Sequence, residues 1–182
     1  MLPFRETKKD IRDGNRFGRG TGLRHVLIFT KTNCVHKMKE FTENGFYIQY
    51  PDSWVLEEDA ESNGETINLQ PPGDCGFFSL SRYPSATSPE ELAQAVLETI
   101  REEYEECEVS PARESYGTYT LEGYDADFFC MDFSCTVTIR TIQHSEYTYV
   151  IFTQRIDTVE NHLAEGFSEV ARLWVEHLVC SF

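Results

Sequence analysis

The sequence predicts a single α+β domain in which a central antiparallel sheet of about six to eight strands lies between helices. Short segments with alternating apolar residues come first, an amphipathic helix follows them, and a second series of strand-like segments leads to a final amphipathic helix. Of the 182 residues, 40% are hydrophobic and 13% are aromatic, which is the composition of one globular domain with a core of its own.

The N-terminal part of the chain differs in charge from the rest. Residues 1–37 contain nine Lys/Arg and three Asp/Glu, a net charge of +6, whereas residues 38–182 contain seven basic and 28 acidic residues, a net charge of −21. Four glycines interrupt the stretch DGNRFGRGTGLRH, and no apolar period is sustained. We therefore predict that residues 1–37 form a disordered or dispensable basic extension, with translation from Met38 as one origin. A basic arm that contacts nucleic acid phosphates is the alternative.

Four short strands are expected before the first helix. Phe46, Ile48 and Tyr50 alternate with more polar residues, and Pro51-Asp52 supplies a turn. The other three strand-like segments are residues 54–56, 65–70 and 77–83. The aromatic residues around the first turn have two interpretations, a ligand groove or a plug at the end of the core. We expect the plug, because aromatic side chains beside a first hairpin usually close the core.

The first helix has the clearest signals in the sequence. Ser88 is placed as the N-cap, Pro89 as the first helical residue, and Glu91 three residues after the cap, which predicts a capping box. An apolar stripe follows at helical spacing, formed by Leu92, Ala93, Val96, Leu97, Ile100, Tyr104 and Cys107. Glutamates and Arg101 lie on the opposite face, so the helix must cover an apolar surface.

The second half of the chain predicts more strands and a closing helix. Strand-like segments span residues 116–121, 124–134, 136–143 and 147–154, with turns expected at Gly117, Gly123 and His144–Glu146. The last segment is apolar on both faces, so the sheet needs cover on both sides. The second cover is a helix predicted over Val159–Leu178 and opened by Asp157 or Thr158. Its apolar stripe is Leu163, Phe167, Val170, Trp174 and Leu178.

This order of elements resembles the PsbP-like superfamily over about residues 43–182. The strongest point of resemblance is the opening segment Phe-x-Ile-x-Tyr-Pro-Asp-x-Trp, from Phe46 to Trp54, followed by the Ser-Pro-Glu-Glu helix and the long C-terminal helix. The superfamily includes the photosystem II extrinsic protein, the Ran-GTPase release factor and bacterial domains of unknown function, some of them chaperones for secreted effectors. The resemblance implies an α/β/α sandwich and a mostly non-enzymatic binding role, but a shared fold does not identify the partner.

Motifs for catalysis and metal binding are weak. The six cysteines, at positions 34, 75, 107, 130, 135 and 180, include no C-x-x-C pair, so we expect free thiols and no zinc site. No histidine lies near a nucleophile elbow. Asp125 and Asp127 would share one face of a strand, which leaves a small metal-dependent hydrolase as an alternative. Cys130 and Cys135, five residues apart, would lie on opposite faces of a regular strand. We expect no catalytic residue, cofactor or metal.

The acidic charge is the remaining functional signal. It would repel nucleic acid and anionic membranes and speed encounter with a basic partner. The acidic side chains concentrate at Glu57, Glu58, Asp59, Glu102, Glu103, Glu105 and Glu106. We therefore expect a soluble, cytoplasmic, cofactor-free module that binds a basic protein partner through this surface, without contact to nucleic acid or membrane in residues 38–182. The second alternative is a chaperone-like adaptor for an apolar segment of a secreted or membrane-bound partner, which requires an exposed apolar sheet face.

Overall fold

The structure is a computed structural model that describes residues 37–43, 45–59, 65–73, 75–157 and 162–180. These residues form nine strands and two helices. The elements are β1 (Met38–Glu43), β2 (Phe46–Pro51), β3 (Val55–Asp59), β4 (Glu65–Gln70), β5 (Gly76–Pro84), α1 (Pro89–Glu103), β6 (Cys107–Tyr116), β7 (Tyr119–Cys130), β8 (Phe133–His144), β9 (Tyr147–Ile156) and α2 (His162–Cys180). The predicted basic extension, residues 1–37, lies outside the described residues except for Lys37.

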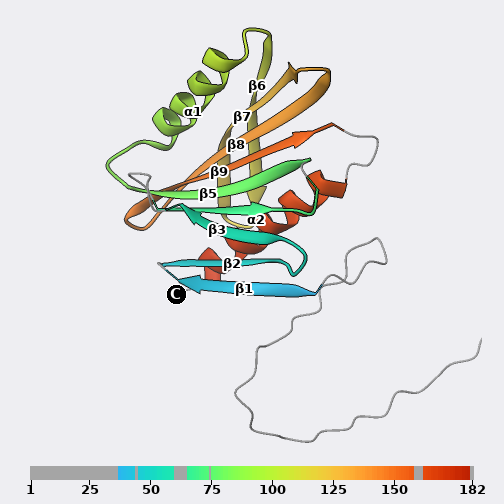
Figure 1. Ribbon diagram of the computed structural model, residues 1–182. Helices are drawn as coiled ribbons and strands as arrows, with labels where there is room; N and C mark the ends of the chain where they lie inside the picture. Colours follow the sequence, from blue (N-terminus) through green and yellow to red (C-terminus); the bar gives the residue numbers. More distant parts are fainter. Residues whose placement is uncertain (1–36, 44, 60–64, 74, 158–161, 181–182) are drawn as a thin grey trace, which may run out of the picture.

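Seven of the strands form one antiparallel sheet in the order β3-β4-β5-β9-β8-β7-β6, and β1 and β2 form a separate hairpin (Figure 1). Neighbouring strands are mostly joined by short turns, and β9 enters the middle of the sheet between β5 and β8. The two edges of the sheet are therefore β3 and β6. The predicted α+β architecture with a central antiparallel sheet is confirmed.

The two helices cover opposite faces of the sheet. On one face, α1 packs over β7, β8 and β9, and its buried residues Ala93, Leu97 and Ile100 join a cluster with the apolar side chains of these strands. On the other face, α2 buries Phe167, Val170, Ala171, Trp174 and Val175 in a second cluster. The central strand β9 contributes alternate residues to each cluster, as its two apolar faces predict.

Helix α1 begins with the predicted capping box. The Ser88 hydroxyl accepts a hydrogen bond from the Glu91 amide at 3.0 Å, and the Glu91 carboxylate accepts one from the Ser88 amide at 3.4 Å. Pro89 occupies the first turn, where its missing amide proton costs nothing. Helix α2 is observed from His162, and its predicted start at Val159 lies outside the described residues.

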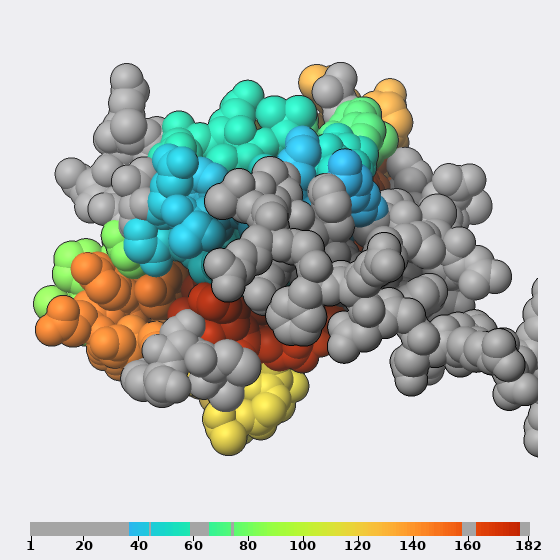
Figure 2. Space-filling model, turned by 90° about the horizontal axis from the view of Figure 1, so that it is seen from below, coloured from blue at the N-terminus to red at the C-terminus, as the bar shows by residue number. Residues whose placement is uncertain are grey.

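The hairpin β1–β2 packs beside α2. Phe46, Tyr50 and Trp54 are buried, with exposed fractions of 3%, 8% and 7%, and they belong to the same apolar cluster as α2. The Trp54 ring meets Phe167 edge to face at a centroid distance of 5.4 Å. Figure 2 shows the hairpin and α2 next to each other on the lower side of the molecule. The expected aromatic plug is confirmed.

Two strands were absent from the sequence prediction. Five strands precede α1 rather than four, because β1 pairs with β2 along its full length. The edge strand β6 was also missed, because its sequence CEVSPARESY is polar and contains Pro111. An edge strand tolerates both features, since one side of its backbone makes no ladder hydrogen bonds.

The predicted turn at Gly123 and the single strand over residues 124–134 were wrong. Gly123 lies inside β7, paired with Ala112 and Arg140, and a Cβ atom there would lie 2.0 Å from the Ile139 carbonyl oxygen. The glycine therefore permits a close approach between strands instead of a turn. The chain turns between Cys130 and Phe133, where Met131 has a positive φ of 56°.

The turn also changes the predicted relation of the two cysteines. Cys130 closes β7 and the buried Cys135 lies on β8, and both belong to the cluster beneath α1. They lie on one face and not on opposite faces, because the chain reverses between them. Both thiols are free.

Candidate functional site

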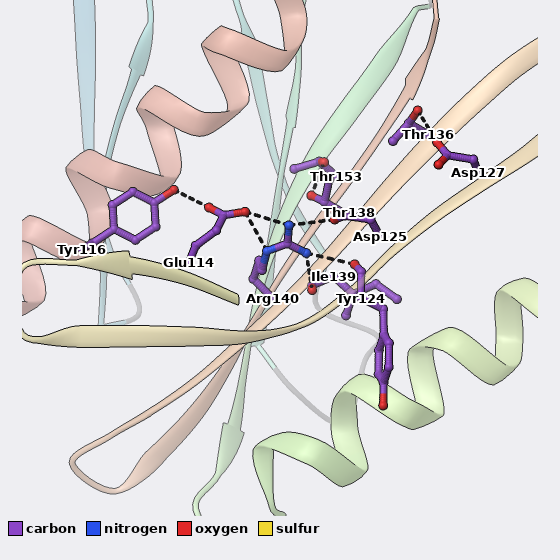
Figure 3. Close-up of polar contacts among 10 residues, drawn as sticks. All are labelled: Glu114, Tyr116, Tyr124, Asp125, Asp127, Thr136, Thr138, Ile139, Arg140 and Thr153. Carbon is purple, nitrogen blue, oxygen red and sulfur yellow. Dashed lines mark hydrogen bonds and ion pairs between the residues drawn. The ribbon is translucent and has the colours of Figure 1, made fainter. Parts of the chain in front are cut away.

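A polar network lies on the face of the sheet that α2 partly covers. Figure 3 shows Arg140 of β8 at its centre, with Glu114 of β6 and Asp125 of β7 on either side. The network occupies the half of the sheet next to the β6 edge, where alternate positions on four strands carry charged or hydroxyl side chains. This arrangement brings Asp125 and Asp127 to one face, as the sequence predicts.

Arg140 is nearly enclosed, since only 7% of its side chain is exposed. Its Nε and Nη2 atoms both lie 2.7 Å from Glu114 Oε1, and Nη2 also lies 2.7 Å from Asp125 Oδ1. Its Nη1 atom donates to the carbonyl oxygens of Tyr124 and Ile139 at 2.9 and 3.0 Å. The Asp125 contact is an ion pair without hydrogen-bond alignment. All three guanidinium nitrogens are therefore engaged, as burial of a charge requires.

Asp127 has a different set of contacts. The Thr136 hydroxyl lies 2.7 Å from Asp127 Oδ1 and 3.0 Å from Asp157 Oδ2, so two carboxylates approach one donor. A hydroxyl has one proton and donates to one of them at a time. Ser134 also donates to Asp157, at 2.9 Å, and Arg155 pairs with Asp157 at 3.4 Å. Asp125 and Asp127 thus belong to separate contact groups rather than to one carboxylate site.

The metal-site hypothesis gains no support from these contacts. Arg140 already neutralises Asp125, and a divalent cation there would have to compete with a buried guanidinium. Within the described ranges, no group of three or more His, Cys, Asp or Glu side chains is placed to hold a metal ion. A cavity of about 80 Å³ lies between the network and α2, with room for a few water molecules.

A larger groove, of about 510 Å³, lies on the opposite face between the start of α1 and strands β6 and β7. Its lining is mixed, with the Tyr124 hydroxyl bonded to Gln94 at 3.2 Å and an exposed ion pair between Arg113 and Glu122. These contacts indicate no particular ligand for the groove.

The predicted acidic residues do not form one surface. Glu57 and Glu58 are exposed on the edge strand β3, and the side chain of Asp59 lies outside the described ones. The other four, Glu102, Glu103, Glu105 and Glu106, are exposed where α1 leads into β6, which is the opposite edge of the sheet. The structure therefore separates the two acidic segments across the width of the sheet.

The turn between β7 and β8 exposes three large apolar side chains that the sequence analysis did not single out. The exposed fractions are 71% for Phe129, 90% for Met131 and 55% for Phe133. We call these three residues the hairpin tip. Among the described residues, Val55 on the other edge is the remaining large hydrophobic side chain with comparable exposure, at 57%. The sequence DFFCMDF, residues 127–133, contains these apolar residues, but it was interpreted as part of one continuous strand, so the turn and its exposed side chains were not predicted.

The base of the hairpin tip is anchored against the end of α1. Tyr104, the C-cap of α1, stacks on Phe128 with ring centroids 3.9 Å apart, and its hydroxyl lies 3.9 Å from Cys130 Sγ. Burial, reinforced by the Cys130 sulfur, raises the pKa of Tyr104 to about 12. The acidic segment from Glu102 to Glu106 is thereby held beside the tip, and Figure 1 shows both at the top of the view.

Comparison with known proteins identifies no family. No protein-family model matches the sequence, and no curated protein matches it either. Among solved structures, a chain from Bacteroides thetaiotaomicron VPI-5482 has a TM-score of 0.48 at 16% identity, covering 70% of this chain and 43% of that one. PA94 from Pseudomonas aeruginosa, a protein of unknown function described as a putative regulator, has a TM-score of 0.41 at 10% identity, with 74% and 94% covered.

LpqN from Mycobacterium tuberculosis, involved in cell envelope biogenesis, has a TM-score of 0.33 at 11% identity, with 84% and 88% of the two chains covered. The chain thus spans less than half of the Bacteroides structure. Likeness at this level assigns no function. Neither of the two described helices has the length and apolarity needed to cross a membrane.

Proposed function

We propose that this protein is a non-enzymatic, PsbP-like binding module that docks a protein partner through the hairpin tip. The observation that carries the proposal is the exposure of Phe129, Met131 and Phe133 at one turn. Aromatic residues and methionine are enriched at the centres of protein interfaces, and scattered single apolar residues are the usual state of a free surface. Three within five residues of one turn favour an interface that wraps around the turn, because the register places Phe129 on the α2 side of the hairpin and Phe133 on the α1 side.

The free energy of burying apolar side chains also favours docking at the hairpin tip. Each of these side chains would contribute about 1.5–3 kcal/mol if it became fully buried. In the isolated chain this free energy is not realised, because α1 and the sheet cover only the base of the hairpin. The stack of Tyr104 on Phe128 restrains the base of the turn, and such restraint lowers the entropic cost of docking.

The alternatives have weaker support. A chaperone for apolar segments would need an exposed apolar sheet face, but the part of the sheet opposite α2 at β4 and β5 carries Thr66, Asn68, Ser79 and Ser81. The Thr66 and Ser81 hydroxyls lie 2.9 Å apart there. A hydrolase would need free carboxylates, and Asp125 is paired with a buried arginine. We therefore base the proposed function on the hairpin tip.

A capture experiment with the full chain as bait tests it. Lysate of the source organism is passed over wild type and over a Phe129→Ser, Met131→Ser, Phe133→Ser triple variant, with washes at about 0.05 and about 0.3 M salt. We expect a partner that wild type retains at both salt concentrations and the triple variant loses. Val55→Ser is the matched control, because Val55 is an exposed apolar residue, at 57%, on the opposite edge of the sheet.

Two results would refute the proposal. In the first, the triple variant retains every protein that wild type retains. In the second, Val55→Ser loses the same proteins as the triple variant. Circular dichroism and urea unfolding of each variant distinguish loss of docking from loss of the fold. All four positions are exposed, so each substitution should change the free energy of unfolding by only about 0.5 kcal/mol.

A further inference from the structure

The apolar side chains of the hairpin tip have acidic neighbours on both sides of the hairpin. Asp127 lies two residues before Phe129 on β7, so both side chains lie on the α2 side, and the register places Glu108 of β6 directly opposite Asp127. Phe133 lies on the α1 side, where the stacked ring of Tyr104 holds the acidic end of α1 against β7. Carboxylates therefore border the tip on both faces of the sheet.

The acidic residues within residues 101–108 and 127–134 form what we call the acidic collar. All of them are exposed, and they are Glu102, Glu103, Glu105, Glu106, Glu108, Asp127 and Asp132. The same two ranges contain one basic residue, Arg101, so seven negative charges and one positive charge give a net charge of −6. Arg155 of β9 lies opposite Thr136 of β8, but it is paired with Asp157 and so adds no net charge. An occupant of the tip meets apolar side chains inside a negative border.

Two residues of the acidic collar are placed unfavourably for the isolated chain. Glu108 and Asp127 lie directly opposite each other on neighbouring strands, where two like charges are destabilising. Both are exposed, and within the described ranges neither forms an ion pair. Asp127 accepts a hydrogen bond from the Thr136 hydroxyl at 2.7 Å, which leaves its charge in place. A lysine or arginine of a bound partner, placed between the two carboxylates, would replace this repulsion by attraction.

We propose that the hairpin tip and the acidic collar form one docking surface for a basic protein segment, in which apolar side chains are flanked by lysine or arginine. The apolar residues of the segment contact Phe129, Met131 and Phe133, and its cations lie against the carboxylates of the collar. This inference rests on the docking function proposed above and names the chemistry of the partner. Because Phe129 and Phe133 lie on opposite sides of the hairpin, the partner carries positive charge on both sides of its apolar residues.

A lipid surface fits the same site less well. Exposed phenylalanine side chains also insert into the boundary between lipid headgroups and acyl chains, so the tip alone is compatible with a membrane. The acidic collar is not, because its net charge of −6 is repelled by anionic headgroups. Charge complementarity therefore favours a basic protein segment as the occupant.

Selection from a random peptide library tests the proposal. Dodecapeptides displayed on phage are selected against the immobilised full chain and, in parallel, against the Phe129→Ser, Met131→Ser, Phe133→Ser variant. We expect the peptides that only wild type enriches to combine aromatic or aliphatic residues with Lys or Arg on both sides. Enriched peptides that are neutral or acidic would overturn the inference, and so would a library that yields no peptide dependent on the tip.

Removal of charge from the acidic collar shows whether its carboxylates take part. A labelled consensus peptide is titrated by fluorescence anisotropy against the Glu106→Gln, Glu108→Gln variant and against the matched control Glu57→Gln, Glu58→Gln, which loses the same charge on the opposite edge. Six strand spacings, about 29 Å, separate the two edges, whereas the Debye length at about 0.05 M salt is about 14 Å. We expect about three- to tenfold weaker binding for the collar variant and less than about a twofold change for the control. Equal losses would overturn the inference, because general charge attraction would then explain them.

The Glu108→Gln variant distinguishes docking from folding. It removes the like-charge pair with Asp127, so the protein should be at least as stable in urea as wild type, whereas its affinity for the peptide should fall. A variant that loses both stability and affinity would show that Glu108 supports the fold and would remove it from the docking surface.

Sedimentation with phosphatidylcholine vesicles that contain phosphatidylserine tests the lipid alternative. We expect wild type and the triple variant to remain equally in the supernatant. Vesicle binding that depends on the hairpin tip, without peptides that depend on it, would overturn the inference in favour of a lipid surface.

Failure of this inference and failure of the proposed function give different results. If wild type captures a protein that the triple variant loses, but the selected peptides carry no positive charge, the tip remains a docking site and the charge requirement is wrong. If neither the lysate nor the library yields a binder that depends on the tip, both statements fail.

Discussion

The guanidinium of Arg140 lies 2.7 Å from the Asp125 carboxylate, with 7% of the arginine side chain exposed and 37% of the aspartate. The pair is thus asymmetric, because the cation is enclosed while the anion is partly hydrated. The same guanidinium binds Glu114, which is 39% exposed, and two backbone carbonyl oxygens. Arg140 therefore holds β6, β7 and β8 together on the face that α2 leaves partly open.

Replacement of Arg140 by methionine should destabilise the fold. The change leaves two carboxylates and two carbonyl oxygens without their donor, and loss of one partner of a buried pair typically costs about 3–5 kcal/mol. Because both carboxylates are more than a third exposed, we expect a smaller loss, about 2–3 kcal/mol in the free energy of unfolding. Urea denaturation measures it. The matched control is Arg113→Met, whose pair with Glu122 is exposed and should contribute less than about 1 kcal/mol. Equal effects of the two substitutions would contradict a structural role for Arg140.

A methyl group at Gly123 should be poorly tolerated. Its Cβ would lie 2.0 Å from the carbonyl oxygen and 2.8 Å from the carbonyl carbon of Ile139, and both atoms belong to a central strand that cannot move freely. We expect Gly123→Ala to lower the free energy of unfolding by about 1–3 kcal/mol, the usual cost of overpacking. Thermal and urea unfolding give the value. A variant as stable as wild type would show that β7 and β8 do not approach this closely.

His177 should make stability depend on pH. Desolvation lowers its pKa from 6.5 in the folded protein, and Glu40 opposes part of the shift. The unfolded chain then binds the proton more readily, so the free energy of unfolding decreases as pH falls through about 6.5. In the wild-type protein the ring centroids of Tyr47 and His177 lie 3.6 Å apart. The His177→Phe variant keeps a ring to stack on Tyr47 but has no titrating group at this position. The wild-type protein should lose more stability than this variant between about pH 7.5 and about pH 5.5. Parallel pH profiles would exclude the effect.

Cys135 should react slowly with alkylating agents in the folded protein. It is 2% exposed, and burial raises the pKa of its thiol, with the Cys130 sulfur adding to the shift. The thiolate is the reactive form, so both effects slow the reaction. Timed iodoacetamide labelling with peptide mass spectrometry should place Cys135 well behind the half-buried Cys75. Urea should remove the difference. Rapid labelling of Cys135 in the folded state would indicate local opening at the end of β8.

The sequence by itself determined the elements whose signals are local. The capping box at Ser88 and Glu91 depends on residues three apart, and the apolar stripe of α2 repeats within single turns, so both were predicted without knowledge of the rest. The apolar residues on both faces of β9 similarly predicted that both sides of the sheet would be covered. Burial of Trp54 and its neighbours was predicted from the aromatic residues around Pro51-Asp52, although the strand before this turn pairs with β1 and not across the turn.

Only the tertiary structure decided which residues meet. Arg140 gave no signal as a partner of Asp125, because an ion pair between neighbouring strands depends on their register, and the turn at Met131 that sets this register was missed. The same missed turn concealed the hairpin tip, since Phe129 and Phe133 read as strand interior until the chain reverses between them. Periodicity reports which face a residue occupies, whereas pairing and exposure depend on what the rest of the chain places against that face.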